Sequence, residues 1–216
     1  MKRLAIFVSG GGTDFQSIID GVNGKTIHAE IVLCVASKQG IYAIERAKQH
    51  NIPYKVFNKS DYACVAEMFD EIASLLDRLE VDLIVLAGYL TILPQPFVAK
   101  YKGKIINIHP SLIPKYCGDG YYGIAVHRAV IEAGEPESGA TVHYVDEGVD
   151  TGNIIRQEKV PVYPEDTPET LAARVLALEH KLLPEVVKQL CANQKNTNGS
   201  RLEFPKIEIE RRKERT

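Results

Sequence analysis

Short apolar runs alternate with longer segments of helical periodicity through the first half of this 216-residue chain. The apolar runs have the length of buried strands, and we expect strands at residues 4–8, 31–36, 54–57, 83–87 and 105–108. Apolar residues at steps of three and four predict helices at 14–22 and 41–49, and a longer helix from Tyr62 to Leu79 with Ser60 as its cap. Because strand–helix–strand units cross over with a right hand, this order predicts a doubly wound sheet.

The pattern changes after Ile108. Residues 140–145 and 154–162 are predicted to form a pair of strands joined by an acidic, glycine-containing turn, which extends the sheet with mixed direction. Thr167 is followed by a proline, as at many helix starts, and spaced leucines and valines then predict a closing helix that ends near Leu190.

We therefore expect a single α/β domain over residues 1–192, with a mostly parallel, Rossmann-like doubly wound sheet and mixed C-terminal strands, followed by a polar C-terminal tail, 193–216. The 26 basic and 28 acidic residues give a net charge of −2, so no global field favours nucleic acid or an anionic membrane as a partner. No apolar run approaches the roughly 20 residues that a membrane helix requires. The four cysteines form no C-x-x-C pair, which is typical of reduced thiols and predicts a cytoplasmic protein.

A glycine-rich loop, Ser9-Gly10-Gly11-Gly12-Thr13-Asp14, lies between the first predicted strand and the first predicted helix. Backbone N–H groups and the positive end of a helix can hold an anion there, so the loop is a candidate phosphate site. It lacks the Gly-Lys-Ser/Thr ending of a Walker A loop, and Phe15 stands where a dinucleotide fingerprint needs a third glycine. A purely structural tight turn remains the alternative.

A second cluster follows the strand at 105–108. Asn107 and His109 are two residues apart, so their side chains point to the same face of a strand and can converge on one ligand atom. A histidine at a strand end is often structural, but Asp150 and His143 favour catalysis, since an acid in a nearby loop can orient or charge an imidazole.

Metal binding and nucleophilic catalysis by a cysteine are two other chemistries that residues of this region could support. His109, His127 and His143 with Asp150 are adequate metal ligands, but the sequence has no H-E-x-x-H motif and no close Cys/His pair, so we expect no metal. Apart from a neighbouring glycine, nothing around Cys117 indicates an activated nucleophile.

Taken in order, several motifs between residues 4 and 190 resemble the folate-dependent glycinamide ribonucleotide formyltransferases of purine synthesis. The matching segments are 8–13, 86–89, 107–114, 139–143, 149–152 and 178–180. The resemblance implies transfer of the formyl group of 10-formyltetrahydrofolate to the amine of glycinamide ribonucleotide, by direct attack through a tetrahedral intermediate. That reaction needs no metal, and we expect a monomer or a homodimer.

The resemblance also implies a role for each matched position. The catalytic residues are Asn107, His109 and Asp150, with Asp150 keeping His109 protonated. The substrate-binding residues are Gly11, Gly12, Thr13 and Asp14 around the phosphate, and Glu179. The folate-binding residues are Leu90, Thr91, Ile92, Asn107, Asp146, Gly148 and Asp150.

The sequence departs from the family pattern at Thr91, where many members carry an arginine, which leaves the binding of the folate's glutamate tail open. The glycine-rich stretch 117–123 is expected to be a mobile loop, and a cis bond before Pro114 suits the turn there. Methionyl-tRNA formyltransferases add a basic carboxyl-terminal domain, and formyltetrahydrofolate deformylases add an amino-terminal regulatory domain; the chain's length and its first strand at Leu4 argue against both. A non-catalytic nucleotide-binding module has no use for the catalytic trio.

Overall fold

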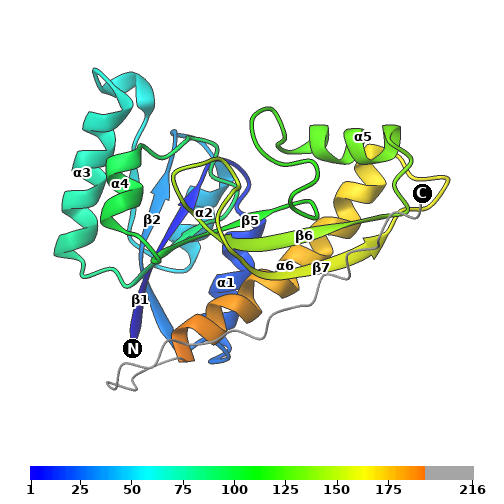
Figure 1. The fold of residues 1–216 in the computed structure, drawn as a ribbon. Helices are drawn as coiled ribbons and strands as arrows, with labels where there is room; N and C mark the ends of the chain where they lie inside the picture. The colour runs from blue at the N-terminus through cyan, green and yellow to red at the C-terminus, as the bar shows by residue number, and fades with distance from the viewer. Residues whose placement is uncertain (193–216) are drawn as a thin grey trace, which may run out of the picture.

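The computed structural model describes residues 1–192, which form one α/β domain around a seven-stranded sheet (Figure 1). The strands are β1 (Lys2–Val8), β2 (Ala29–Ala36), β3 (Tyr54–Val56), β4 (Leu83–Leu86), β5 (Ile105–His109), β6 (Glu137–Tyr144) and β7 (Ile154–Pro161). The helices are α1 (Thr13–Asn23), α2 (Tyr42–Gln49), α3 (Val65–Arg78), α4 (Gln95–Lys100), α5 (Ile124–Glu132) and α6 (Pro168–Ala192). The predicted tail, 193–216, lies outside the described residues.

The strand order is β3-β2-β1-β4-β5-β6-β7. The pairs from β3 to β5 are parallel, whereas β6 runs antiparallel to β5 and to β7. The doubly wound order with mixed C-terminal strands is confirmed. In the inner parallel strands β1, β2 and β4, residues 4–8, 31–36 and 83–86 are apolar and buried because both faces of the sheet are covered there, whereas the outer strand β7 alternates between exposed and half-buried residues.

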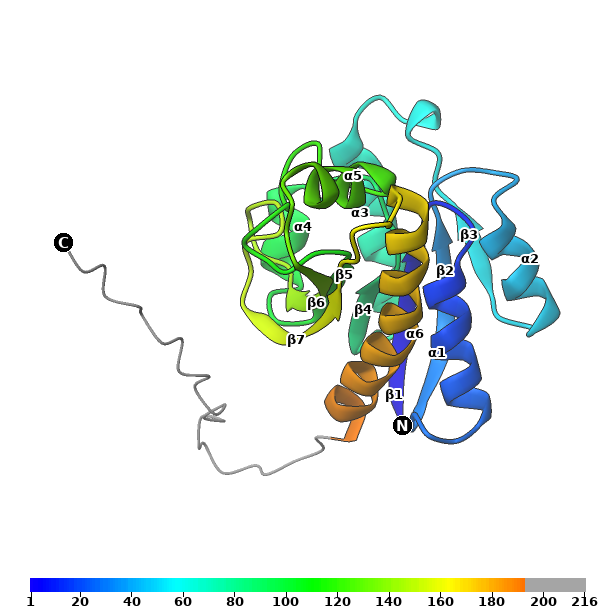
Figure 2. The ribbon, with the colours of Figure 1, turned by 90° about the vertical axis from the view of Figure 1, so that its right-hand side faces the viewer.

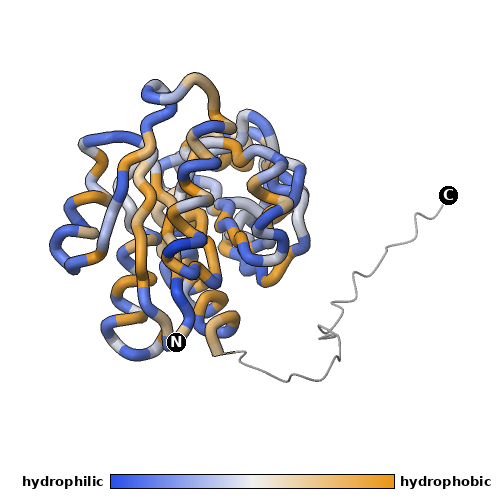
Figure 3. Tube along the Cα trace, turned by 90° about the vertical axis from the view of Figure 1, so that its left-hand side faces the viewer, coloured by the Kyte–Doolittle hydropathy of each residue, from blue (hydrophilic) through white to orange (hydrophobic). Residues whose placement is uncertain are grey.

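Alternate residues of β1 feed two separate cores. Leu4, Ile6 and Val8 pack beneath α1, α2 and α6, whereas Ala5 and Phe7 pack beneath α3 and α4. Figure 2 shows α1 and α6 side by side, and Figure 3 shows the apolar residues gathered along the inner strands. This arrangement leaves the carboxyl ends of the parallel strands free to form a site.

The start of α3 differs from the prediction. Ser60 lies in a short 3-10 helix, Lys59–Asp61, which Asn58 caps by accepting a hydrogen bond from the backbone N–H of Ser60. The α-helix begins at Val65, and Glu67 reaches back to accept from the N–H of Ala63 at 3.0 Å. Ser60 is therefore not the cap of α3: the N-cap is Cys64, whose side chain makes no capping hydrogen bond, and Glu67 instead binds the residue before it.

Two helices, α4 and α5, were not predicted. The first has only six residues, too few for a periodic pattern to stand out. The second buries Val126, His127 and Val130 on one face, and the histidine interrupts its apolar stripe. Among residues 1–192, no helix is long and apolar enough to cross a membrane.

Candidate active site

The loops that follow β1 and β4 are joined at the carboxyl edge of the sheet. The N–H of Ser9 donates to the carbonyl of Gly88 at 3.1 Å, and the Ser9 hydroxyl accepts from the N–H of Leu90 at 3.0 Å. These two bonds hold the glycine-rich loop beside the segment that the sequence assigns to folate binding. Two separate sequence motifs therefore form one continuous edge.

The three residues predicted to be catalytic, called the trio below, lie close together. Asn107 Nδ2 donates to Asp150 Oδ1 at 3.3 Å, and His109 Nδ1 lies 3.5 Å from Asp150 Oδ2. Asn107 and His109 lie on β5, whereas Asp150 lies on the turn between β6 and β7. The side chains of His109 and Asp150 are only 6% and 12% exposed, so water screens the charge of Asp150 little at the imidazole.

The backbone of Asp150 is left-handed, with φ 57°. This conformation costs a residue with a Cβ roughly 1–2 kcal/mol, and surrounding contacts must maintain it. Asp146 supplies two of them, because its Oδ1 accepts from the N–H of Gly148 at 3.1 Å and from the hydroxyl of Thr151 at 2.6 Å. The N–H of Gly118 also donates to Asp150 Oδ2 at 3.1 Å, so the stretch expected to be mobile contacts this side chain.

His143 is a fourth member of the cluster, because β6 pairs it directly with Asn107. Its Nδ1 lies 2.9 Å from the carbonyl of Tyr144, which can only accept, so Nδ1 carries the proton of the neutral ring. Its Nε2 then accepts from Asn107 Nδ2 at 3.2 Å and lies 3.5 Å from Asp150 Oδ1. The amide of Asn107 is thereby held from two sides.

The protonation of His109 differs from the expectation. Burial lowers the pKa of His109 below its ordinary value; the bond to Tyr116 and the charge of Asp150 act the other way but do not outweigh it. Its Nε2 donates to the carbonyl of Tyr116 at 2.8 Å, so Nε2 is the nitrogen that carries the proton of the neutral ring. The prediction that Asp150 keeps His109 protonated is therefore wrong for the free site.

Asp150 itself remains an anion. Burial alone raises the pKa of its carboxyl, but the two neighbouring imidazoles and the backbone N–H of Gly118 outweigh burial and lower that pKa. The site thus pairs a neutral imidazole with a carboxylate. This combination is suited to moving one proton and holding a developing negative charge on a ligand oxygen.

The glycine-rich loop requires glycine at one position in particular. Gly12 precedes α1 with φ 69°, and a Cβ built there lies 2.7 Å from the Cβ of Ala43 in α2. Sequence reasoning missed Arg46, whose Nε donates to the carbonyl of Gly11 at 2.9 Å and whose Nη1 donates to Gln16 at 3.0 Å. The loop therefore carries a guanidinium beside the start of a helix, a favourable place for an anion.

Glu179 reaches the same loop from α6. Its side chain is buried, with 7% of the residue exposed, and it lies near enough to Asp14 for the charge of Asp14 to raise its pKa. An open crevice of about 550 Å³ is lined by their chain neighbours Thr13 and His180, with Gln16 and Arg46 also among its walls. The substrate-binding residues predicted from distant motifs thus meet where α1 packs against α6.

The predicted folate-binding residues carry exposed apolar surface. Leu90 and Ile92 are 63% and 66% exposed, and Val149, between Gly148 and Asp150, is 40% exposed. Exposed apolar side chains flanking a buried polar cluster are typical of a ligand site. Thr91 lies between Leu90 and Ile92.

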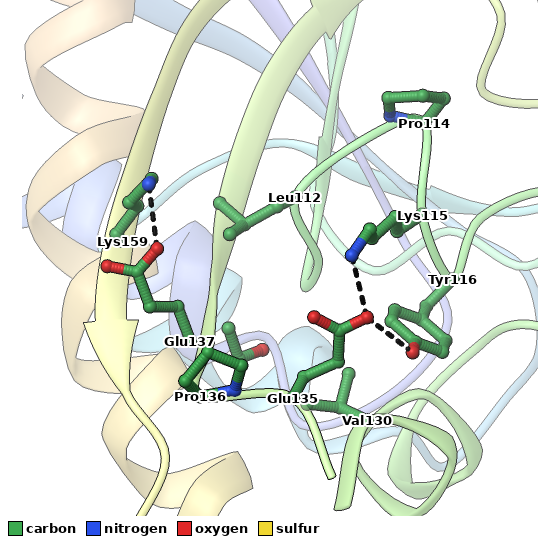
Figure 4. Close-up of a pocket in the computed structure, with 10 residues that line it drawn as sticks. Leu112, Pro114, Lys115, Tyr116, Val130, Glu135, Pro136, Glu137 and Lys159 are labelled. Atoms are coloured by element: carbon green, nitrogen blue, oxygen red, sulfur yellow. Dashed lines mark hydrogen bonds and ion pairs between the residues drawn. The ribbon is translucent and has the colours of Figure 1, made fainter. Parts of the chain in front are cut away.

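A cavity of about 260 Å³ is lined in part by Leu112, Lys115 and Tyr116, from the segment that follows His109 in the chain (Figure 4). Glu135 accepts there from Lys115 at 2.7 Å and from the hydroxyl of Tyr116 at 3.0 Å. The cavity wall thereby fixes Tyr116, whose carbonyl binds His109. The Ile113–Pro114 peptide bond is cis, as the sequence suggests.

The possible metal ligands do not all join the trio. His127 is buried on α5, and the trio's hydrogen bonds do not include it. Within the part of the chain that the structure describes, no three or more His, Cys, Asp or Glu residues are grouped so that they could hold a metal ion.

The family model described as formyl transferase matches residues 2–187 of this chain. The chain belongs to the formyl transferase family. This confirms the resemblance seen in the sequence motifs. The match spans the elements that carry the trio, the glycine-rich loop and Glu179.

Individual formyl transferases are similar over most of the chain. The phosphoribosylglycinamide formyltransferase of Haemophilus influenzae is 45% identical over 87% of this chain and 86% of its own length. The chloroplastic enzyme of that name from Arabidopsis thaliana is 44% identical over 88% of this chain and 65% of its own length. The crystal structure of glycinamide ribonucleotide transformylase 1 from Geobacillus kaustophilus superposes with a TM-score of 0.83 at 41% identity, covering 88% of this chain and 99% of that one.

Proposed function

We propose that this formyl transferase moves the formyl group of 10-formyltetrahydrofolate to the amine of 5′-phosphoribosylglycinamide in purine synthesis. The observation that carries the proposal is the convergence of Asn107, His109 and Asp150 beside the glycine-rich loop, in a chain 45% identical to a phosphoribosylglycinamide formyltransferase. A module that only binds nucleotides needs the loop but not the trio.

In the reaction, the amine nitrogen attacks the formyl carbon and forms the new C–N bond. The carbonyl oxygen becomes an oxyanion, and collapse of the tetrahedral intermediate breaks the bond to the folate nitrogen, N10. One proton leaves the amine and ends on that nitrogen. Asn107 Nδ2 and His109 Nε2 are the donors for the oxyanion, and a preorganised donor of this kind is worth about 2.7–4 kcal/mol of barrier.

The hydrogen bonds of the free site support these roles. His109 already presents an N–H, because its Nε2 donates to the carbonyl of Tyr116. A ligand oxygen is also an acceptor and can take the place of that carbonyl. The oxyanion then raises the pKa of His109, so the imidazole takes up the amine proton, relayed by Asp150, as the negative charge develops. Asp150, held as an anion by the N–H of Gly118, stabilises this imidazolium, and the same proton then passes to N10 when the tetrahedral intermediate collapses.

The two substrates occupy the two halves of the edge. The phosphate of the ribonucleotide binds the backbone N–H groups of Gly11, Gly12 and Thr13, with Arg46 adding positive charge. Glu179 and Asp14 contact the rest of the ribonucleotide. The folate lies on residues 90–92 and 146–150. Thr91 carries no charge, so the glutamate tail of the folate needs a cation from another position.

Release of tetrahydrofolate from 10-formyltetrahydrofolate, followed by absorbance, tests the proposal with three acceptors: glycinamide ribonucleotide, initiator methionyl-tRNA and water. We expect release only with the ribonucleotide. Release with water alone indicates a deformylase, and release with the tRNA indicates a methionyl-tRNA formyltransferase. No release with any acceptor overturns the proposal in favour of a binding module.

A further inference from the structure

Asp14, Glu179 and His180 form a cluster of titratable groups that the trio does not use. Asp14 lies in the first turn of α1, and the other two are consecutive residues of α6, the helix that lies beside α1 (Figure 2). His180 Nε2 lies 3.8 Å from Asp14 Oδ1, beyond hydrogen-bond distance. Both of these atoms are buried, and neither has a hydrogen-bond partner among the described residues.

The charges around this cluster leave the two carboxyls uncompensated. Arg46 on α2 directs its hydrogen bonds to Gly11 and Gln16 rather than to either carboxyl. Farther along the same surface, Asp20 on α1 and His50 at the end of α2 both contact Gln16.

The third member of the cluster does not compensate them either. Burial and the charge of Arg46 lower the pKa of His180. Its ring therefore supplies little positive charge at neutral pH.

Two neighbouring buried carboxyls without a cation cannot both be charged at low cost. Burial raises the pKa of Asp14 to about 6, and burial together with the charge of Asp14 raises the pKa of Glu179 well above its ordinary value. A single proton held by such a pair belongs to both groups. This pair borders the loop that carries the ribonucleotide's phosphate in the proposed function.

We propose that Asp14 and Glu179 share one proton, and that ribonucleotide binding is coupled to holding it. The inference rests on the proposed function, because it needs the phosphate on Gly11, Gly12 and Thr13. A second carboxylate charge at the start of α1 repels a phosphate dianion, whereas the shared proton removes that charge. The bound dianion in turn favours the protonated pair, so complex formation takes up a proton when the free pair has lost part of it.

The carboxyls can be examined first without any ligand. In a 13C carboxyl NMR titration of the full chain, Glu179 is expected to titrate well above the usual glutamate range. Asp14→Asn removes the neighbouring charge while keeping the side chain's shape, so the pKa of Glu179 falls. Asp20→Asn, on the same helix, removes an exposed charge and serves as the matched control, with no change at Glu179. A Glu179 that titrates normally, or that ignores Asp14→Asn, overturns the proposal. If Asp14→Asn does not fold, the pKa of Asp14 is followed instead in Glu179→Gln, which removes the other carboxyl of the pair.

The coupling is measured by calorimetric titration of glycinamide ribonucleotide at pH 7 in buffers of different ionisation enthalpy. Wild type and Asp20→Asn should take up a measurable fraction of a proton, and Asp14→Asn should take up less. Since the ligand phosphate has its own pKa near 6, the difference between variants is the decisive quantity. Equal uptake in all three proteins refutes the coupling while the proposed function stands. Absence of ribonucleotide binding in wild type refutes the proposed function and the coupling together, and the NMR titration still decides whether the carboxyls share a proton.

Discussion

Replacing Asp150 by asparagine removes the negative charge of the trio while nearly preserving its shape. The carboxylate accepts from the N–H of Gly118 at 3.1 Å and from Asn107 at 3.3 Å, and it lies 3.5 Å from both His109 and His143. Asparagine keeps one acceptor oxygen but turns an NH2 group toward donors. It can neither stabilise an imidazolium nor accept a proton from the attacking amine.

The expected loss in kcat is about 10²–10⁴-fold, the usual contribution of a positioned acid–base group. This corresponds to about 2.7–5.5 kcal/mol of barrier. The expected loss in stability is smaller, within about 2 kcal/mol, because the new unfavourable contact is offset by no longer burying a charge. Turnover is measured as tetrahydrofolate release, and stability by urea denaturation of the same preparation.

Asp82→Asn is the matched control. Asp82 also accepts from a backbone N–H, that of Arg3 at 2.9 Å, and it pairs with Lys2 at 3.0 Å, just before β4 and away from the carboxyl edge. This variant should lose stability without losing kcat. If Asp150→Asn retains turnover within threefold of wild type, or if Asp82→Asn loses as much kcat, the role given to the Asp150 charge is wrong.

Three further outcomes follow from the same contacts. Gly12→Ala places a Cβ against Ala43 at a left-handed backbone position, so the loop must shift. Calorimetric titration should then show weaker binding of the ribonucleotide than in wild type and little change in binding of the folate. Equal weakening of both ligands contradicts the loop's role. His109 is neutral in the free site in its active form, and burial lowers its pKa. The value of kcat/KM should therefore stay constant through the pH range in which an ordinary histidine titrates and fall only below that range. A fall centred at or above pH 6.5 contradicts this. Burial lowers the pKa of His127 to about 4, so the stability that its neutral ring contributes is complete above pH 6.5 and is lost as pH falls toward 4. Measured by urea denaturation between pH 7 and pH 5, the wild type should lose roughly 2 kcal/mol more free energy of unfolding than His127→Gln. Equal losses in the two proteins refute the assignment.

The elements that the sequence predicts well are those whose burial is uniform. The inner parallel strands are covered on both faces over residues 4–8 and 31–36 and therefore appear there as unbroken apolar runs, and α3 has a regular stripe from Val65 to Leu76. The predicted start of α3 is too early, because Ser60 lies in a separate 3-10 helix and the N-cap is Cys64, whose side chain makes no capping hydrogen bond. Helix α4 was too short, and α5 buries a histidine within its apolar face. Apolar periodicity therefore fails to locate a helix or its start where the helix is short, has no capping side chain or buries a polar residue.

The residues of the site also divide into those that the sequence could predict and those that it could not. The trio could be predicted because its motifs lie at strand ends, and the carboxyl ends of neighbouring strands meet. The roles of His143, Arg46 and Gly118 depend on cross-strand register and on loop contacts that no local pattern encodes. The protonation of His109 depends on how completely its ring is buried. Residue type and spacing thus predict which groups meet, whereas burial decides their charge.

The change from parallel to antiparallel pairing at β5 and β6 makes the trio possible. In the parallel part of the sheet, each strand sends the chain away through a helix after its carboxyl end. Strand β6 instead runs back along β5, which pairs His143 with Asn107 and returns the chain past the start of β5, where the N–H of Val145 donates to the carbonyl of Ile105 at 3.0 Å. The turn that follows can then bring Asp150 to Asn107 and His109, from a left-handed residue held by Asp146 and Gly118. The turn that carries the acid can be short because β6 and β7 are antiparallel, whereas a β7 parallel to β6 would need a longer crossover connection there.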